Sequence, residues 1–210
     1  DRENQAKFPF LTANVFYADK EGKTNEGVGF RPNWAKPFMV KKVHGVKVGV
    51  IGMSLPSTPS VTNPINVADL VFTNPVEAVE DQLPKVEATG ANMVVVLAHI
   101  GGYWPDFGEL ADFVCDLDED KIDLVVTGHT HGRIDDVICG IPVIQSYSSG
   151  TAFSRVDFTV DTASGEATDY TMNSYPVTTY NTYYGNPASY QRWDTGEYQV
   201  VVPDPAITAI

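Results

Sequence analysis

Three of the four histidines in this sequence follow apolar segments and stand close to glycine. His99 closes the run MVVVLAH and precedes Ile-Gly-Gly, whereas His129 and His131 lie in TGHTHGR after the run IDLVV. Neutral imidazole is the commonest metal ligand in proteins. An H-x-H pair in a loop can turn both rings toward one point, because Gly128 and Gly132 allow the backbone to turn. A single histidine is more often an ordinary core or surface residue, but two such strand ends together predict a metal site formed by these three residues.

A hairpin is predicted before the first histidine-bearing strand. Its arms are 38–43 and 46–53, and His44 with Gly45 forms the turn, so His44 is interpreted as a turn residue and not as a ligand. The second arm, VKVGVIGM, is apolar on both sides, which predicts a central strand covered on both faces. A proline- and serine-rich loop without regular structure is predicted for residues 54–64, and such loops often line a functional surface.

Helices are predicted between the buried strands. Asn74 and Pro75 form a helix start and Gly90 a stop, with a kink or break expected at Pro84. A second helix is predicted over 107–117. The later segments are predicted as antiparallel strands over 136–138, 141–147, 153–160 and 168–175. This alternation predicts an α/β fold with a mixed sheet, which some schemes class as α+β, and ligands of open α/β sheets bind just beyond the carboxyl ends of the strands.

Composition and charge limit the classes of function. The 210 residues are enough for one ordinary domain with an extension, and a hydrophobic content of 43% allows a real core. The formal charge of −13 repels phosphate backbones and no local basic patch is present, so nucleic-acid binding is not expected. No apolar run reaches the ~18 residues needed to cross a bilayer. For Cys115 and Cys139, two buried free thiols are the preferred interpretation, and a disulfide is the alternative in an oxidising compartment.

Beyond the histidines, several segments resemble one family in the same order along the chain. These segments are FPFLTANV at 8–15, KPFMVKKVHGVKVGVIGMS at 36–54, NPVEAVEDQLPKVEATGANMVVVLAHIGG at 74–102 and GIPVIQSYSSGTAFSRVDFTVD at 140–161. Together with the Gly-His-Thr-His element at 128–131, they resemble the calcineurin-like metallophosphoesterases, in the 5′-nucleotidase and 2′,3′-cyclic nucleotide phosphodiesterase branch. The resemblance covers residues 8–175 and corresponds to the C-terminal part of the family's catalytic domain.

The resemblance implies half of the four-layer α/β/β/α sandwich that this family forms, with a mixed sheet. It also implies two divalent metal ions, Zn, Mn or Fe with Mg or Ca as further options, bridged by a hydroxide that attacks phosphorus in line. Carried over by motif, His99 and His129 would bind one ion and His131 the other. The implied substrates are nucleotides, as for a 5′-nucleotidase, and an extracellular, periplasmic or cell-envelope location follows by analogy.

The sequence departs from the family because the rest of the metal site is missing. The family takes its other ligands and a catalytic histidine from Asp-x-His, Gly-Asp and Asn-His-Glu motifs, and none of these occurs here. We therefore expect residues 1–176 to be the C-terminal portion of the catalytic domain, and 177–210 to be a tyrosine-rich extended tail leading to a nucleotide-binding domain. Expected partners are the missing N-terminal half-domain, that C-terminal domain and a phosphoester substrate, with a homodimer through an exposed sheet edge as an alternative. The isolated chain is expected to hold at most one metal ion weakly and to be inactive, and no catalytic residue is assigned within it.

Other classes of protein account for fewer of these residues. HTHGRID resembles the metallo-β-lactamase motif H-x-H-x-D-H, but Arg133 and Ile134 occupy the places of the Asp and the next His. An amidohydrolase barrel places H-x-H on its first strand and needs most of a ~250-residue barrel after it, which the sequence after His131 does not supply. The remaining alternative is a non-catalytic scaffold or interaction fragment that docks through aromatic side chains. This docking strip would comprise Tyr180, Tyr183, Tyr184, Tyr190, Trp193 and Tyr198.

Overall fold

A mixed sheet forms the centre of the computed structural model, which describes residues 6–19, 29–178, 189–191 and 198–200. Its six strands follow the order β4-β5-β7-β8-β10-β9. In that order they are β4 (Phe38–Val43), β5 (Val46–Met53), β7 (Met93–Ala98), β8 (Leu124–Val126), β10 (Ile141–Ser146) and β9 (Arg133–Ile138). The inner strands β5, β7, β8 and β10 are parallel to one another, and each edge strand is antiparallel to its neighbour. The predicted α/β fold with a mixed sheet and the predicted hairpin of β4 with β5 are both confirmed.

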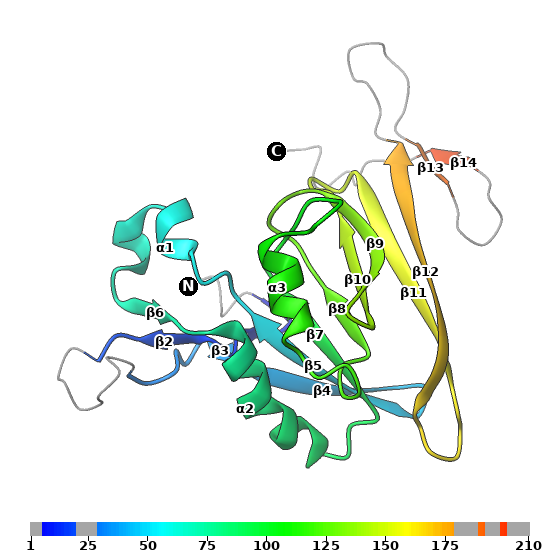
Figure 1. The fold of residues 1–210 in the computed structure, drawn as a ribbon, viewed down its shortest axis with the longest axis horizontal. Coiled ribbons are helices and arrows are strands. Elements are labelled where there is room, and N and C mark those ends of the chain that lie inside the picture. Colours follow the sequence, from blue (N-terminus) through cyan, green and yellow to red (C-terminus); the bar gives the residue numbers. More distant parts are fainter. Residues whose placement is uncertain (1–5, 20–28, 179–188, 192–197, 201–210) are drawn as a thin grey trace, which may run out of the picture.

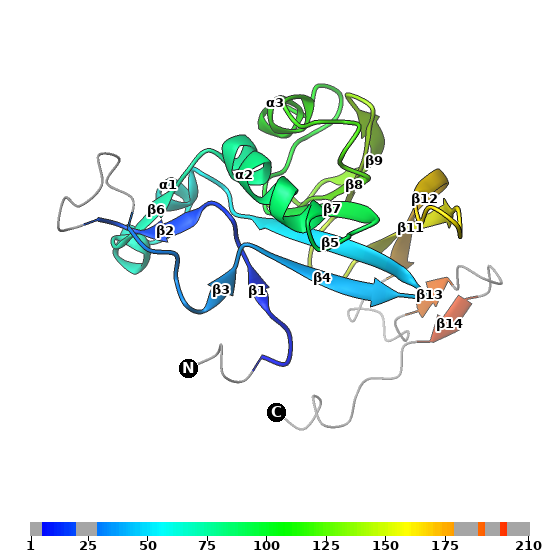
Figure 2. The same cartoon turned by 90° about the horizontal axis from the view of Figure 1, so that it is seen from below.

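Two helices, α2 (Pro75–Glu87) and α3 (Glu109–Cys115), cover one face of this sheet, as Figures 1 and 2 show from two directions. The register places Ile51, Val96 and Val125 side by side on this face, and each is 0% exposed. Gly49 lets α2 approach closely, since a Cβ at this position would lie 2.2 Å from a methyl carbon of Val86. Among the described residues, no helix has both the length and the apolar character needed to cross a membrane.

The opposite face of the sheet is less covered than the sequence predicts. Val48, Val50 and Val95 are partly exposed, and Leu97 of β7 is 46% exposed. The prediction that β5 is covered on both faces is therefore wrong for the described residues. The physical reason is that α2 and α3 both lie on the same side, as expected for successive right-handed crossovers between parallel strands. Within the described residues, α2 and α3 therefore form a helix layer on one face of the central sheet only (Figure 2).

Smaller strand pairs surround the central sheet. β1 (Phe10–Leu11) is parallel to β3 (Ala35–Lys36), and β2 (Val15–Tyr17) is antiparallel to β6 (Leu70–Phe72). A second sheet is formed by β11 (Ala152–Val160), β12 (Ala167–Thr178), β13 (Ser189–Gln191) and β14 (Tyr198–Val200). β12 thus continues past the predicted domain boundary at residue 176, and most of the predicted tyrosine-rich tail lies outside the described residues.

Two local predictions need correction. The loop predicted over residues 54–64 contains the short helix α1 (Thr58–Val61), and a 3₁₀ turn, η2 (Pro64–Val67), begins at its last residue. Each has a proline in its first turn, where no amide donor is needed. The helix α2 begins as predicted, with the Asn74 side chain accepting bonds from the amides of the first turn. The helix is not broken at Pro84, however, but continues to Glu87, close to the stop predicted at Gly90. Packing of Val79 and Val86 in the core offsets the amide bond that proline cannot make.

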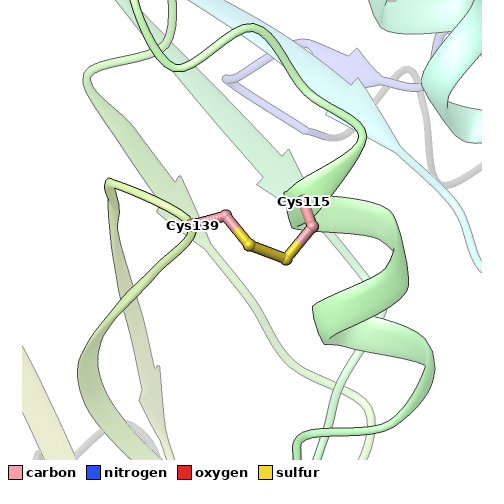
Figure 3. The surroundings of a disulfide bond; sticks show 2 residues. All are labelled: Cys115 and Cys139. Carbon is pink, nitrogen blue, oxygen red and sulfur yellow. A yellow bond between two sulfur atoms is a disulfide. The ribbon is translucent and has the colours of Figure 1, made fainter.

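A disulfide joins Cys115, the last residue of α3, to Cys139 in the turn between β9 and β10 (Figure 3). The two Cα atoms are 5.1 Å apart, within the usual range for a bridged pair. The preferred interpretation of two buried free thiols is therefore wrong, since the cysteines are bonded and both residues are exposed. The fold brings the exposed end of α3 next to the exposed turn between β9 and β10. The spacing of the two cysteines in the sequence does not reveal this proximity.

Candidate metal site at the ends of two parallel strands

The predicted ligands all follow strands that end at the same edge of the sheet. His99 directly follows Ala98, the last residue of β7, and His129 and His131 lie in the loop after β8. Parallel pairing of Leu97 with Val126 places the two strand ends level with each other. The backbone amide of His99 also donates a hydrogen bond to the carbonyl of Met53, the last residue of β5, at 2.9 Å. The His99 loop is therefore anchored to the neighbouring strand on one side and faces the β8 loop on the other.

The rings of His99 and His129 are in direct contact. Their centroids are 5.3 Å apart and the ring planes meet at 64°, an edge-to-face arrangement. The pKa of His99 is lowered, first by partial burial and then by the nearby positive charge that His129 and His131 would carry. The neutral imidazole, which is the form that binds metals, is therefore favoured at His99. His131 contributes to this effect and so lies close enough to interact electrostatically with His99.

Both histidines of the H-x-H pair have left-handed backbone conformations, with φ of 75° at His129 and 57° at His131. Such conformations are unfavourable for residues with a Cβ and persist where the surroundings hold them. The loop that carries His99 supplies part of this support. A Cβ on Gly101 would lie 2.1 Å from the carbonyl oxygen of Gly128 and 2.5 Å from the hydroxyl of Thr130. Backbone contact between the two loops is thus possible only because position 101 has no side chain.

A buried polar residue, Gln145 of β10, lies against the same loop and was not identified from the sequence. It is 1% exposed and hydrogen-bonds Thr127, Thr130 and the Gly132 carbonyl. The signal that could have revealed it is a glutamine in the otherwise apolar run IPVIQ, since a buried polar side chain must find partners.

The end of β5 carries a second polar cluster. Asn14 is 0% exposed; its amide donates to the carbonyls of Ser54 and Thr73, and its oxygen accepts from the Ser54 amide at 2.9 Å. The hydroxyls of Thr12 and Ser54 are 3.0 Å apart. These bonds connect the first strands to the carboxyl end of β5. We interpret the cluster as structural, because it holds the segments beside the histidine loops together.

The spacing of the two imidazole rings is compatible with two ligands of one metal ion. Two rings bound to one tetrahedral ion at ~2.0–2.1 Å place their centroids roughly 5 Å apart, which agrees with the spacing of 5.3 Å between His99 and His129. Among the described residues, no group of three or more His, Cys, Asp and Glu side chains is arranged so that it could hold a metal ion. His44 stands apart from the pair, in the exposed turn between β4 and β5 as predicted, with a φ of 49°.

A small cavity lies where the two loops continue away from the histidines. It has a volume of about 220 Å³ and is lined by Trp104, Phe107, Arg133, Ile134, Asp135 and Asp136. The guanidinium of Arg133 bonds the carboxylate of Asp135 at 2.6 Å. The sequence predicts no substrate-binding residue. Two residues that line this cavity, the exposed Trp104 and Arg133, are close in sequence to the candidate ligands.

The chain is similar to several known proteins. No family model matches it. Over 172 residues it is 28% identical to the cell wall protein Lmo0130 of Listeria monocytogenes, covering 75% of this chain and 22% of that protein. It is 26% identical to the snake venom 5′-nucleotidase of Naja atra, covering 74% of this chain and 30% of that enzyme. Among solved structures, the 5′-nucleotidase precursor of Thermus thermophilus matches 82% of this chain and 34% of its own, with a TM-score of 0.63 and 25% identity. The chain therefore spans about a third or less of the length of these relatives.

Proposed function

We propose that this chain, a distant homologue of the calcineurin-like phosphoesterases of the 5′-nucleotidase type, provides part of a metal-dependent phosphoester hydrolase site. The observation that carries the proposal is the contact between the imidazoles of His99 and His129, which come from two neighbouring parallel strands. A pair of imidazoles at the carboxyl ends of such strands, beside glycine loops, is suited to divalent metal binding.

Each residue of the proposed site has a separate task. His99 and His129 would hold one ion, and His131, on the same loop as His129, would bind the second. Bound divalent ions of this kind polarise a phosphoryl oxygen and neutralise its charge. Gly101 allows the two loops to touch, and the left-handed backbone at His129 and His131 directs the loop toward His99.

The proposed site is incomplete within this sequence. The 210 residues contain no Asp-x-His or Asn-His-Glu motif, and a dimetal site requires further oxygen or nitrogen ligands than three imidazoles. We infer that these ligands are supplied by a longer protein of which this chain is a part. The isolated chain then binds one ion weakly and does not turn over phosphate esters.

The relatives and the disulfide support a substrate class and a location. Nucleotides are the proposed substrates of the complete protein, because several relatives are 5′-nucleotidases by name. An extracellular or cell-envelope location is proposed, because disulfides persist mainly in oxidising compartments and Cys115 and Cys139 are bonded. A cell wall protein of a bacterium is among the relatives.

Turnover of p-nitrophenyl phosphate and AMP with added Mn²⁺ or Zn²⁺ tests this function in two arms. The isolated chain should bind the ion and release no phosphate above the metal-only rate. In the complete protein, His129→Ala should lower kcat/KM by at least about 10-fold, since even residues that only support a metal ligand have effects of this size, whereas His44→Ala should leave it unchanged. Rapid metal-dependent hydrolysis by the isolated chain would contradict the proposal that this chain holds only part of the site. Full activity of the His129→Ala protein would contradict the function itself and favour a scaffold role.

A further inference from the structure

Gln145 lies on the strand next to the H-x-H loop, in a position that lets it contact both sides of His131. It belongs to β10, where Ile144 pairs with Val126, the last residue of β8. The side chain therefore reaches past the end of β8 into the loop that follows. It is one of four buried polar residues in the described part of the chain, and all other residues of β10 except Ser146 are apolar and buried.

The side-chain amide of Gln145 makes all of its hydrogen bonds to this loop. Its nitrogen donates to the carbonyl oxygen of Gly132 at 3.0 Å and to the hydroxyl of Thr130 at 3.0 Å, which accounts for both of its hydrogens. Its oxygen accepts a hydrogen bond from the hydroxyl of Thr127 at 3.1 Å. The residues directly before and after His131 are thus both bonded to one rigid, buried amide group.

Thr130 extends this network to the other loop. Because its hydroxyl accepts a bond from Gln145, its single hydrogen is free to donate to the carbonyl of Gly102 at 3.0 Å. Gly102 belongs to the loop that begins at His99. A continuous path of hydrogen bonds therefore runs from β10 through Thr130 to the His99 loop, and it fixes the separation of the two loops that carry the candidate ligands.

We propose that Gln145 is a positioning residue that holds the His129–His131 loop in its metal-binding conformation; this inference rests on the function proposed above. His129 and His131 both adopt left-handed conformations that the loop does not favour by itself. The bonds from Gln145 to Thr130 and Gly132 lie directly before and after His131 in the chain and hold the His131 backbone in place. Without them the loop has other conformations available, and the entropy lost on binding a metal ion is larger.

Calorimetric titration of the 210-residue chain with Zn²⁺ tests the inference. Gln145→Leu removes every bond of the amide, and Thr130→Val removes only the hydroxyl that links the two loops, with little change in shape. Each should raise the dissociation constant for Zn²⁺ about 10- to 100-fold, as found for residues that orient metal ligands. Val143→Ala is the matched control, because Val143 lies two residues earlier on the same strand, is 0% exposed and belongs to the core. Its folded form should bind Zn²⁺ as the unmodified chain does.

The outcomes separate this inference from the function on which it rests. Unchanged Zn²⁺ affinity in Thr130→Val and Gln145→Leu, with a clear loss in His99→Ala and His129→Ala, overturns the role of Gln145 and leaves the histidine site intact. Equal loss in Val143→Ala also overturns it, because general loosening of the sheet then explains the effect. Unchanged affinity in the histidine variants overturns the proposed site. If Gln145→Leu does not fold by circular dichroism, Thr130→Val, which leaves the core untouched, decides the question.

Discussion

The imidazoles of His99 and His129 meet edge to face at the carboxyl edge of the sheet, with ring centroids 5.3 Å apart. Neither residue is in a regular element, and each is positioned by the strand that ends just before it. The contact follows from the parallel pairing of β7 with β8, which brings the ends of the two strands level. The parallel pairing of β7 with β8 therefore brings the two rings to the same edge of the sheet, and the loops after these strands set the distance between the rings.

Gly101→Ala should disrupt the contact between these loops. The added methyl group would lie 2.1 Å from the Gly128 carbonyl oxygen, so the backbones must separate. We expect a loss of about 1–3 kcal/mol in the free energy of unfolding, as for other overpacked positions, together with loss of Zn²⁺ binding. Urea denaturation and a Zn²⁺ titration measure the two effects.

Gly128→Ala is the control for this substitution. A methyl group there meets the His99 ring nitrogen at 3.4 Å, an ordinary contact distance. The stability of Gly128→Ala should therefore fall less than that of Gly101→Ala. An equal or larger fall would show that close approach at Gly101 does not control this part of the fold.

Reduction of the disulfide should destabilise the folded chain. The bond between Cys115 and Cys139 closes a loop across a sequence separation of 24, and the loss of chain entropy in the unfolded state is worth about 3 kcal/mol for a loop of this size. Urea unfolding with and without dithiothreitol measures the difference. A double Cys115→Ser, Cys139→Ser variant should match the reduced chain and should not respond to dithiothreitol. A midpoint that does not change on reduction would contradict the stabilising role.

Asp123→Asn should change how stability depends on pH. Burial raises the pKa of Asp123 in the folded chain, against the opposing effect of the bond that its carboxylate accepts from the amide of Val94. The folded state therefore binds a proton more readily than the unfolded state, and the free energy of unfolding falls as pH rises from the ordinary aspartate pKa of about 3.9 through the raised value. In Asp123→Asn the side chain is neutral at every pH, so this loss of free energy of unfolding does not occur.

Thermal unfolding at pH 4 and pH 7 checks this prediction. The stability of Asp123→Asn relative to the unmodified chain should increase from pH 4 to pH 7. Asp69→Asn, which removes the charge of an exposed carboxylate, is measured alongside as the control. A relative stability of Asp123→Asn that decreases with rising pH would contradict the effect of burial on this carboxyl group.

Sequence patterns predicted those parts of the structure that depend on local order along the chain. The apolar run 93–98 became β7, the Asn74 cap began α2, and the position of His99 and His129 after neighbouring strands followed from the alternation of helices and strands. The break expected at Pro84 reflects only the local effect of proline, whereas tertiary packing of α2 holds the helix together.

Features that depend on distant residues were missed. The pairing of Cys115 with Cys139 depends on where the β9–β10 turn lies relative to the end of α3, and no periodicity records that distance. Gln145 acts through a loop that precedes it in the chain, so its role becomes visible only when β10 lies beside β8. The partial exposure of Leu97 depends on which side of the sheet the helices cover.

We propose that His99 and His129 bind one metal ion together, with His131 beside them. Zn²⁺ titration of the 210-residue chain, followed by the ring nitrogen resonances of ¹⁵N-labelled histidine, tests it most directly because His44 serves as an internal reference. We expect the resonances of His99 and His129 to shift together with one midpoint, while those of His44 shift only at much higher Zn²⁺. Independent midpoints for His99 and His129, or a response at His44 as early as theirs, would contradict a shared site.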